Sequence, residues 1–530
     1  MTDQPELRGQ SAAVHTASRA GGQVPGHLTG GSGSSLTGKV MPAEEAAAFI
    51  APGDHVGMSG FTGFGHPKAV PAALVRRAAE ATARGDRFAV SVWTGSSTAP
   101  ELDGALAAVD GIDLRMPYQS DPVTRAKIND GSLDYLDVHL SHVAQMVAEG
   151  FFGHLDVALV EVAGITPDGA LIPSSSVGNN SAWLDAADRV ILEVNSWQLP
   201  ELEGMHDIYY GTALPPDRTP IPILRPSDRI GEPYLRCSPD KIVAVVPTNA
   251  PDYATPARPM DSASELIAGH VVDFLTHEVR HGRLPATLPP LQSGVGNVTN
   301  AVLAGLGRGS FPPLTAYTEV VQDGMLRLLG SGAMTVASAT AFSLSEDGMA
   351  ELRANIGGYR GQIILRSQEI SNHPEVIRRL GCLAMNGMVE ADIYGNVNST
   401  HVMGSSMLNG IGGSGDFARN AYVAMFLSPS TVKDGTISCI VPMASHVDHT
   451  EHDVHVIITE QGVADLRGLP PRHRAQKIID QCAHPAYRAA LQDYLDRATA
   501  TAPGKHTPHL LGEAFAWHMR YLQEGTMRPA

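Results

Sequence analysis

Short apolar runs alternate with glycine-rich loops and helical stretches over most of the chain. The run 55–59 leads into a glycine loop at 60–67, and a helical stretch follows through 74–83 before the next run. Runs of this kind are typical of strands buried on both faces of a parallel sheet, with helices as crossovers. The pattern therefore predicts an α/β fold with an open, mostly parallel sheet. The predicted strands are 55–59, 88–93, 157–162, 189–194 and 241–246.

Helical patterns lie at both ends of this region. Near its start, Pro42 precedes Glu44 and Glu45, which suits a helix with proline near its first position and acids in its first turn. After Pro470-Pro471 the pattern is helical through Tyr494, and it is helical again over 510–522. We expect the last of these segments to be a helical tail that packs on the fold.

One carboxylate is singled out by its position. Residues 314–318 form an apolar, β-branched and aromatic run, and we predict a short buried strand ending at Glu319, followed by a helix over 321–329. A carboxylate there lies at the carboxyl edge of the sheet, where open α/β folds bind their ligands. The alternative is a solvated loop residue or a charge at a helix N-terminus, where the dipole favours it.

Two glycine loops recur at a fixed separation. Ser59-Gly60 and Ser293-Gly294 both precede predicted helices, as do Gly178 and Gly412, and positions 59 and 293 differ by 234, as do positions 178 and 412. Matched loops indicate a duplicated α/β unit. A chain with 54 glycines also offers coincidences, so chance remains the alternative.

Composition narrows the class of protein. The net charge of -17 and the lack of a basic stripe argue against binding to nucleic acid. The sequence has no run of 18 apolar residues, so no transmembrane helix is expected. The four cysteines lack CxxC spacing and suit buried positions in a reducing compartment, so we expect a cytoplasmic protein.

The length of 530 residues predicts more than one domain. Residues 1–38 are polar and rich in glycine and serine, and we expect a flexible tail. A proline-rich junction near 215–259 separates the two halves. The predicted division is a disordered tail (1–38), an N-terminal α/β domain (39–250), a C-terminal α/β domain with the nucleophile (251–500) and a helical tail (501–530).

Several ordered motifs together resemble one family. They are Val92-Trp93-Thr94-Gly95, Gln292-Ser293-Gly294-Val295-Gly296-Asn297-Val298, Glu369-Ile370-Ser371-Asn372, Asn409-Gly410-Ile411-Gly412-Gly413-Ser414-Gly415-Asp416 and Thr459-Glu460-Gln461-Gly462. With Glu319, they resemble the acetyl-CoA hydrolase and succinyl-CoA:acetate CoA-transferase family, a branch of the class I CoA-transferases. The resemblance covers about 40–495 and implies two similar open-sheet domains with the site between them.

The resemblance also implies roles for particular residues. Glu319 would be the nucleophile, and the backbone N–H groups of Val295 and Gly413 would stabilise the oxyanion. Asn372 and Glu460 match family positions beside the nucleophile. The coenzyme A contacts implied are Gly294, Val295, Gly296, Asn297, Val298, Asn409, Gly413 and Lys433. For the carboxyl substrate, Ser59, Thr62 and Thr94 offer hydroxyls at predicted strand ends.

The implied activity is transfer of coenzyme A between an acyl-CoA, succinyl-CoA or acetyl-CoA, and a short carboxylate such as acetate, succinate or propionate. It would proceed through a covalent glutamyl-CoA thioester, with coenzyme A as a substrate and no permanently bound cofactor. An acetyl-CoA hydrolase is the alternative, and a non-catalytic protein that binds coenzyme A or a nucleotide is a more distant one. The family also implies a homodimer.

A cluster of histidines and aspartates offers metal-binding side chains at close spacing. We favour a hydrogen-bonded wall or a subunit contact, because thioester exchange at a glutamate needs no metal. The cluster consists of His446, Asp448, His449, His452, Asp453 and His455.

Overall fold

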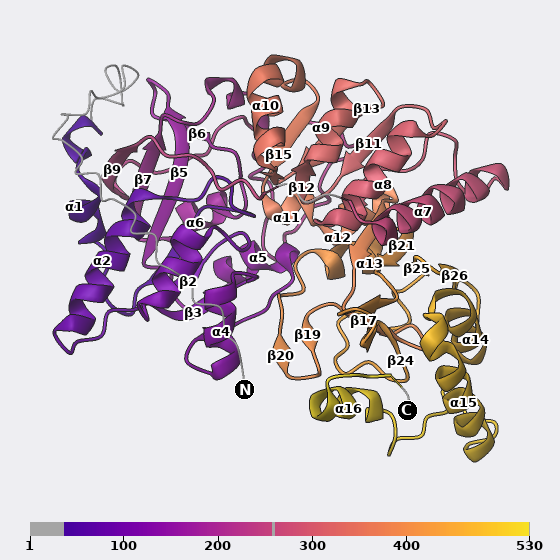
Figure 1. Cartoon of the computed structure of the whole chain (residues 1–530). Coiled ribbons are helices and arrows are strands. Elements are labelled where there is room, and N and C mark those ends of the chain that lie inside the picture. The colour runs from indigo at the N-terminus through magenta and orange to yellow at the C-terminus, as the bar shows by residue number, and fades with distance from the viewer. Residues whose placement is uncertain (1–35, 257–259, 529–530) are drawn as a thin grey trace.

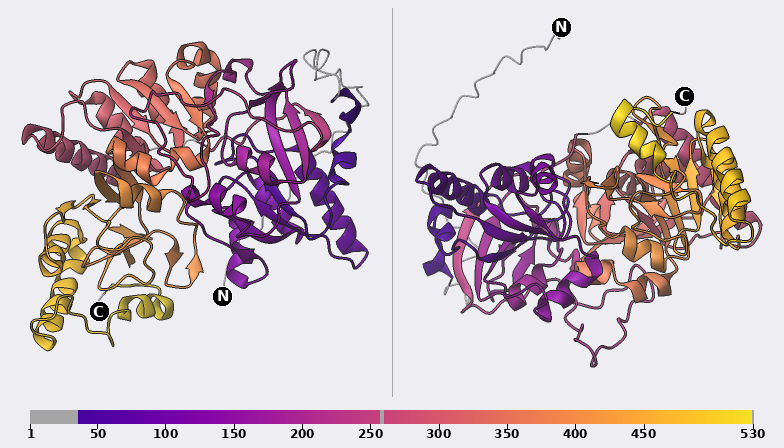
Figure 2. Two further views of the ribbon diagram at one scale, coloured as in Figure 1. Left: turned by 180° about the vertical axis from the view of Figure 1, so that it is seen from behind. Right: turned by 90° about the horizontal axis from the view of Figure 1, so that it is seen from below.

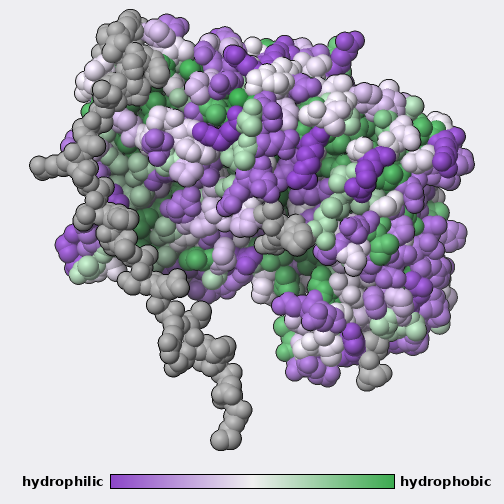
Figure 3. Space-filling model, turned by 45° about the horizontal axis from the view of Figure 1, so that its top comes forward, coloured by the Kyte–Doolittle hydropathy of each residue, from purple (hydrophilic) through white to green (hydrophobic). Residues whose placement is uncertain are grey.

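Two α/β halves lie side by side in the computed structural model, which describes residues 36–256 and 260–528 (Figure 1). Most of the predicted tail, residues 1–35, lies outside the described residues. Figure 2 places the C-terminal helices at the outer end of the second half, away from the first. On the face seen in Figure 3, hydrophilic residues surround small hydrophobic patches. Among the described residues, no helix is both long and apolar enough to cross a membrane.

The first half is built on a sheet with the strand order β4-β3-β2-β1-β5-β7-β9, all parallel, with β6 (Leu171–Pro173) antiparallel to β5. Helices such as α2 (Ala69–Ala83), α4 (Pro122–Asp130) and α6 (Asn180–Ala186) connect the strands. All five strands predicted from the apolar runs are confirmed. The strands are β1 (His55–Met58), β2 (Val90–Trp93), β3 (Ile112–Met116), β4 (Asp134–Tyr135), β5 (Val157–Ile165), β7 (Arg189–Asn195) and β9 (Ile242–Thr248).

The second half is built on a sheet with the order β26-β25-β21-β16-β10-β11-β13-β15-β8, parallel except for β26 against β25. Its outermost strand β8 (His206–Asp207) comes from the first half of the sequence and pairs with β15. The other strands are β10 (Leu291–Ser293), β11 (Leu314–Tyr317), β13 (Met334–Ala339), β15 (Ile363–Arg366), β16 (Leu383–Gly387), β21 (Val423–Leu427), β25 (Val456–Thr459) and β26 (Gly462–Asp465).

The two sheets share one topology. In the first, β1 lies between β2 and β5, and the chain runs outward through β3 and β4 on one side and β7 and β9 on the other. In the second, β10 lies between β11 and β16, with β13 and β15 on one side and β21 and β25 on the other. The recurring loops lie at the ends of equivalent strands, since Ser59-Gly60 directly follows β1 and Ser293-Gly294 begins at the last residue of β10. The strand orders therefore confirm the duplicated α/β unit.

Two predicted helices begin later than expected. After Glu319 the chain forms another strand, β12 (Val320–Gln322), before α9 (Asp323–Gly330), because β-branched Val320 and Val321 pair in parallel with β14 (Ala341–Ser343). The tail helix α16 spans Ala516–Glu524, not 510–522, because Gly512 disfavours helix and the N–H of Leu510 donates to the Tyr494 hydroxyl. The predicted helices after Pro470 are α14 (Pro471–Cys482) and α15 (Pro485–Thr501).

A buried carboxylate caps the helix that follows the first glycine loop. The side chain of Glu193, at the middle of β7, accepts from the backbone N–H groups of Lys68, Ala69 and Val70 at 2.8, 3.0 and 2.7 Å. These groups open α2 and have no partner within the helix. Glu193 thus fixes α2 against the sheet.

We expect Glu193→Ala to lower the free energy of unfolding of the first half by about 3 kcal/mol, because three buried N–H groups lose their acceptor. Urea denaturation measures the loss. Glu80→Ala, an exposed change on the same helix, serves as the control. Equal stability of the two variants would contradict the capping role.

Candidate active site

The carboxyl edges of the two sheets meet at one cavity of about 510 Å³. The loops after β1, β2 and β3 supply one wall, and the loops after β10, β11 and β16 supply the other. This is where open parallel sheets place their ligands. The lining includes Phe61, Thr62, Ser96, Ser97, Thr98, Tyr118, Ser120, Tyr253, Gly294, Val295, Glu319, Asn386, Gly387, Asn409, Gly410, Gly412, Gly413 and Ser414.

Glu319 lies in the bend between β11 and β12, on the second wall of this cavity. Its backbone carbonyl accepts from the N–H of Thr340 at 2.8 Å and of Ala341 at 3.3 Å, which holds the bend to the neighbouring strand. Its side-chain Oε1 accepts from Asn372 Nδ2 at 2.9 Å. The predicted nucleophile and the predicted Asn372 are therefore in direct contact.

Gly413 approaches the same carboxylate with its backbone. Its backbone lies against the Glu319 carboxylate, and its N–H favours the ionised form of that group by lowering its pKa. A Cβ on Gly413 would lie 1.6 Å from Glu319 Oε1 and 2.3 Å from Asn372 Nδ2. Only glycine permits this approach, because any side chain would displace the carboxylate.

Burial raises the pKa of the Glu319 carboxyl, and the hydrogen bonds from Asn372 and Gly413 offset part of the rise. The carboxylate is thus held by the Asn372 amide, beside the Gly413 backbone, in a partly buried position. A poorly hydrated anion is a better nucleophile than a solvated one, because less solvent must be removed for attack.

The loop after β10 forms the neighbouring part of the wall. The Gly294 N–H donates to the Met385 carbonyl at 2.9 Å, and its own carbonyl accepts from Gln322 Nε2 at 2.9 Å. Gly294 and Val295 both line the cavity, and Val295 is 62% exposed. The next residues begin α8 (Asn297–Arg308). Of the residues the structure describes, Gly296, Asn297 and Val298 are not in the cavity lining.

Of the two other residues predicted to contact coenzyme A, both of which the structure describes, one lines the cavity and the other does not. Asn409 lines the cavity, and its Nδ2 donates to the Tyr118 hydroxyl at 3.3 Å. Lys433 lies in an exposed turn between β22 (Thr431–Val432) and β23 (Ile437–Ser438), with φ of 53°. The structure does not bring Lys433 to the described lining of the cavity. Its contact with coenzyme A stays a prediction.

Four predicted residues remain, and one of them lies in the described lining of the cavity. Glu460 accepts from the backbone N–H of Ser430 at 2.7 Å and from Gln461 Nε2 at 2.9 Å, and it lies outside the described lining. Thr62 lines the cavity. Ser59 and Thr94 are fully buried, and within the described residues they are not part of the lining.

Sequence reasoning assigned no role to Tyr118, Ser141 or Asp416. Tyr118 lies across the cavity from the second sheet and contacts Asn409, and Asp416 lies three residues after Gly413 and bonds to Ser141. Asp416 belongs to the glycine motif and could have been noted from it. The contacts of Tyr118 and Ser141 join segments far apart in the chain, and the sequence carries no local signal for them.

The cluster of histidines and aspartates packs against the glycine loop 410–415 through Ser414. Asp448 accepts from the Ser399 N–H at 2.6 Å and from Thr400 Oγ1 at 2.9 Å. His449 Nε2 lies 3.1 Å from Ser414 Oγ and 3.3 Å from Ser399 Oγ. In the part of the chain that the structure describes, no group of three or more metal-binding side chains is arranged around a common point.

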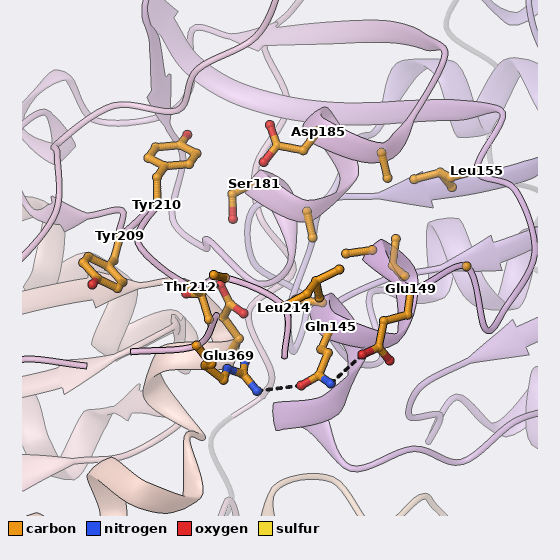
Figure 4. A pocket seen from close by; sticks show the side chains of 18 of the residues that line it. Gln145, Glu149, Leu155, Ser181, Asp185, Tyr209, Tyr210, Thr212, Leu214 and Glu369 are labelled. Atoms are coloured by element: carbon orange, nitrogen blue, oxygen red, sulfur yellow. Dashed lines mark hydrogen bonds between the residues drawn. The ribbon is translucent and has the colours of Figure 1, made fainter. Parts of the chain in front are cut away.

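A second cavity, of about 690 Å³, lies on the other side of the short helix α11 (Gln368–Ser371) (Figure 4). Glu369 faces it and accepts from Thr212 Oγ1 at 3.1 Å, while Arg218 bonds to Gln145. None of the described residues assigned to the thioester chemistry lines it. The smaller cavity around Glu319 is therefore the candidate active site.

The raised pKa of Glu319 has a consequence for stability. A carboxyl whose pKa is higher in the folded than in the unfolded chain destabilises the fold above that pKa, and the cost disappears as the pH falls to the ordinary value of 4.5. We expect Glu319→Gln to unfold at a higher Tm than the wild type at about pH 7.5, and at an equal Tm below about pH 4.5. Scanning calorimetry at both pH values, with exposed Glu346→Gln as control, measures this. A lower Tm at pH 7.5 would contradict it.

Models of two domains match the chain. The acetyl-CoA hydrolase/transferase N-terminal domain matches residues 33–247, and the acetyl-CoA hydrolase/transferase C-terminal domain matches residues 348–495. Among solved structures, RipA from Yersinia pestis shares the fold, with a TM-score of 0.68 at 23% identity over 88% of this chain and 98% of that one.

Curated relatives align over almost the whole length. Succinyl-CoA:acetate CoA-transferase of Clostridium kluyveri is 49% identical, with 93% of this chain and 91% of that protein covered. Propanoyl-CoA:succinate CoA transferase of Escherichia coli is 47% identical, with 92% and 98% covered. Acetyl-CoA hydrolase of Schizosaccharomyces pombe is 44% identical, with 90% and 93% covered. The chain therefore belongs to the acetyl-CoA hydrolase/transferase family, whose members are CoA-transferases and acetyl-CoA hydrolases.

Proposed function

We propose that this enzyme transfers coenzyme A between an acyl-CoA and a short carboxylate through a thioester on Glu319. The observation that carries the proposal is the partly buried Glu319 carboxylate, held by the Asn372 amide and the Gly413 N–H in a cavity between the two sheets. The relatives named for succinyl-CoA with acetate and for propanoyl-CoA with succinate indicate the substrate class.

The reaction runs in two mirrored halves. The Glu319 carboxylate attacks the acyl-CoA carbonyl, and collapse of the tetrahedral intermediate expels coenzyme A thiolate and leaves a mixed anhydride. The thiolate then attacks the glutamyl carbonyl of the anhydride, which forms the glutamyl-CoA thioester and releases the first carboxylate. An acceptor carboxylate reverses these steps. In the complete reaction one thioester is exchanged for another, so the exchange is close to isoenergetic.

Backbone donors stabilise the oxyanions along this route. The Gly413 backbone lies against Glu319, and the Val295 N–H belongs to the loop on the same wall. A donor fixed in advance needs no reorganisation as charge develops, and each such donor accounts for about 10²- to 10³-fold in rate. We assign the two N–H groups to the two oxyanions of the exchange.

The other predicted residues enter the proposal with more distant roles. Residues 294–298, Asn409 and Lys433 would bind coenzyme A, which is a substrate and not a resident cofactor. Asn372 and Glu460 would orient the carboxyl groups. The proposal includes a homodimer in the cytoplasm and the division of the chain at about residue 250.

Hydrolysis of acetyl-CoA is the second candidate function, since several relatives carry that name. The same glutamyl-CoA thioester would then be cleaved by water in place of a carboxylate. The two activities differ in whether water or a carboxylate reaches the thioester. The acceptor that cleaves the thioester therefore distinguishes a hydrolase from a transferase.

The covalent intermediate can be observed directly. We expect intact protein mass to rise by one coenzyme A after incubation with acetyl-CoA, and borohydride to reduce the adduct, in the wild type but not in Glu319→Ala. Faster loss of the adduct with acetate or succinate than in buffer would identify a transferase. Equal loss in buffer would identify a hydrolase. Release of coenzyme A without any adduct would remove Glu319 from a covalent role.

The close approach of Gly413 gives a second test. We expect Gly413→Ala to lower kcat by about 10²-fold or more, because its Cβ would overlap the Glu319 carboxylate and push it from its donors. Gly357→Ala serves as the matched control, because nothing lies within 4 Å of its added Cβ. Steady-state kinetics of both variants measure the difference. Wild-type kcat in Gly413→Ala would contradict the geometry.

A further inference from the structure

The segment 408–413 of the second half forms one side of the active-site cavity. It connects β20 (Ser406–Met407) to α13 (Ser414–Asn420), and each of its six residues lines the cavity. At its end, Gly413 lies against the Glu319 carboxylate. A shift of this segment would therefore move the Gly413 backbone away from the proposed nucleophile.

Asn129, near the end of α4 in the first half, fixes the residue at which this segment begins. Its Oδ1 accepts from the Met407 N–H at 2.7 Å, and its Nδ2 donates to the Met407 carbonyl at 2.8 Å. A backbone N–H can only donate and a carbonyl can only accept, so the two bonds also fix which way the amide faces. From the same helix, Arg125 Nη1 donates to the Leu408 carbonyl at 3.1 Å.

Asp137 holds the middle of the segment. It lies between β4 and the 3-10 helix η5 (Leu140–His142), in the first half. Its two carboxylate oxygens accept from the Ile411 N–H at 3.0 and 2.9 Å. Hydrogen bonds to a carboxylate are stronger than those between neutral groups. Ile411 is two residues before Gly413, so this bond restrains the part of the segment that reaches Glu319.

Gly410 lets the first half come this close. A Cβ on Gly410 would lie 2.7 Å from Asp137 Oδ1 and 3.0 Å from the Tyr118 ring, and closer still to the Tyr135 hydroxyl. Any other residue would push the segment away from these side chains. The first half therefore contacts the segment through side-chain packing as well as through hydrogen bonds.

We propose that Asn129 and Asp137 are positioning residues, which hold the segment 408–413 so that Gly413 stays against Glu319. The inference deepens the proposed function and rests on it. Both side chains are described by the structure, and neither belongs to the cavity lining, so they would act on the chemistry through the segment. The first half would thus set the position of a loop that belongs to the second.

The role predicts a loss of rate that depends on the acceptor at position 137. We expect Asp137→Ala to slow formation of the coenzyme A adduct about 10-fold or more, because a small displacement of the reacting groups is costly. Asp137→Asn should stay within about three-fold of the wild type, since its amide oxygen still accepts from the Ile411 N–H. Asn129→Ala should resemble Asp137→Ala. Asp134→Ala, an exposed change on β4, is the matched control.

A double variant tests whether the effect passes through Gly413. Because Gly413→Ala alone already displaces the Glu319 carboxylate, Asp137→Ala/Gly413→Ala should be no slower than Gly413→Ala. Quenched-flow mass spectrometry measures the adduct rates. Hydrogen exchange, followed by mass spectrometry, should be about 10-fold or more faster over 408–413 in Asp137→Ala, and unchanged over α2.

Three results would overturn the positioning role while the glutamyl thioester stood. They are additive losses in the double variant, an unchanged adduct rate in Asp137→Ala, and faster exchange throughout the chain, which would make the loss of rate a folding defect. Turnover of the wild type without any adduct would overturn the proposed function, and with it the role of these residues in the chemistry. The exchange rates in the absence of substrate would still report whether Asp137 holds the segment.

Discussion

The site depends on the absence of one side chain. Gly413 brings its N–H to Glu319 through space in which a Cβ would lie 1.6 Å from the carboxylate oxygen. That approach requires α13 to begin at this point, the bend after β11 to carry Glu319, and the end of α11 to deliver Asn372 beside them. Glu319 follows β11, α11 follows β15 and α13 precedes β21, and all three strands belong to the second sheet. The strand order of this sheet is therefore what brings the three groups together.

The duplicated topology explains why the cavity has two dissimilar walls. Both sheets present glycine loops at their carboxyl edges, but only the second carries a carboxylate at the end of the strand after the first loop. The first sheet instead contributes hydroxyl and aromatic groups, among them Thr62, Ser96 and Tyr118. One copy of the unit thus supplies the proposed nucleophile, and the other supplies the surface that faces it.

Much of this was predictable from sequence where the signal was local. The apolar runs predicted the strands and placed Glu319 at a sheet edge, and the recurring glycine loops indicated the duplication. The helix after Glu319 was misplaced because Val320 and Val321 are paired by β14, a tertiary contact that overrides local pattern. Asp416 went without a role because its partner Ser141 is 275 residues away. Lys433 was assigned by resemblance alone, and the described cavity does not include it.

The edge strand β8 has a consequence for how the chain can be divided. The two sheets repeat one topology, but β8, from the first half of the sequence, is a strand of the second sheet. There its Asp207 forms an ion pair with buried Arg366. A fragment that ends at about residue 250 would carry this strand away, and the remaining fragment would keep an uncompensated buried guanidinium. The two repeats are therefore not structurally independent of each other. Two separately produced pieces would have to reassemble by strand addition, because the second piece would lack β8, the outermost strand of its sheet.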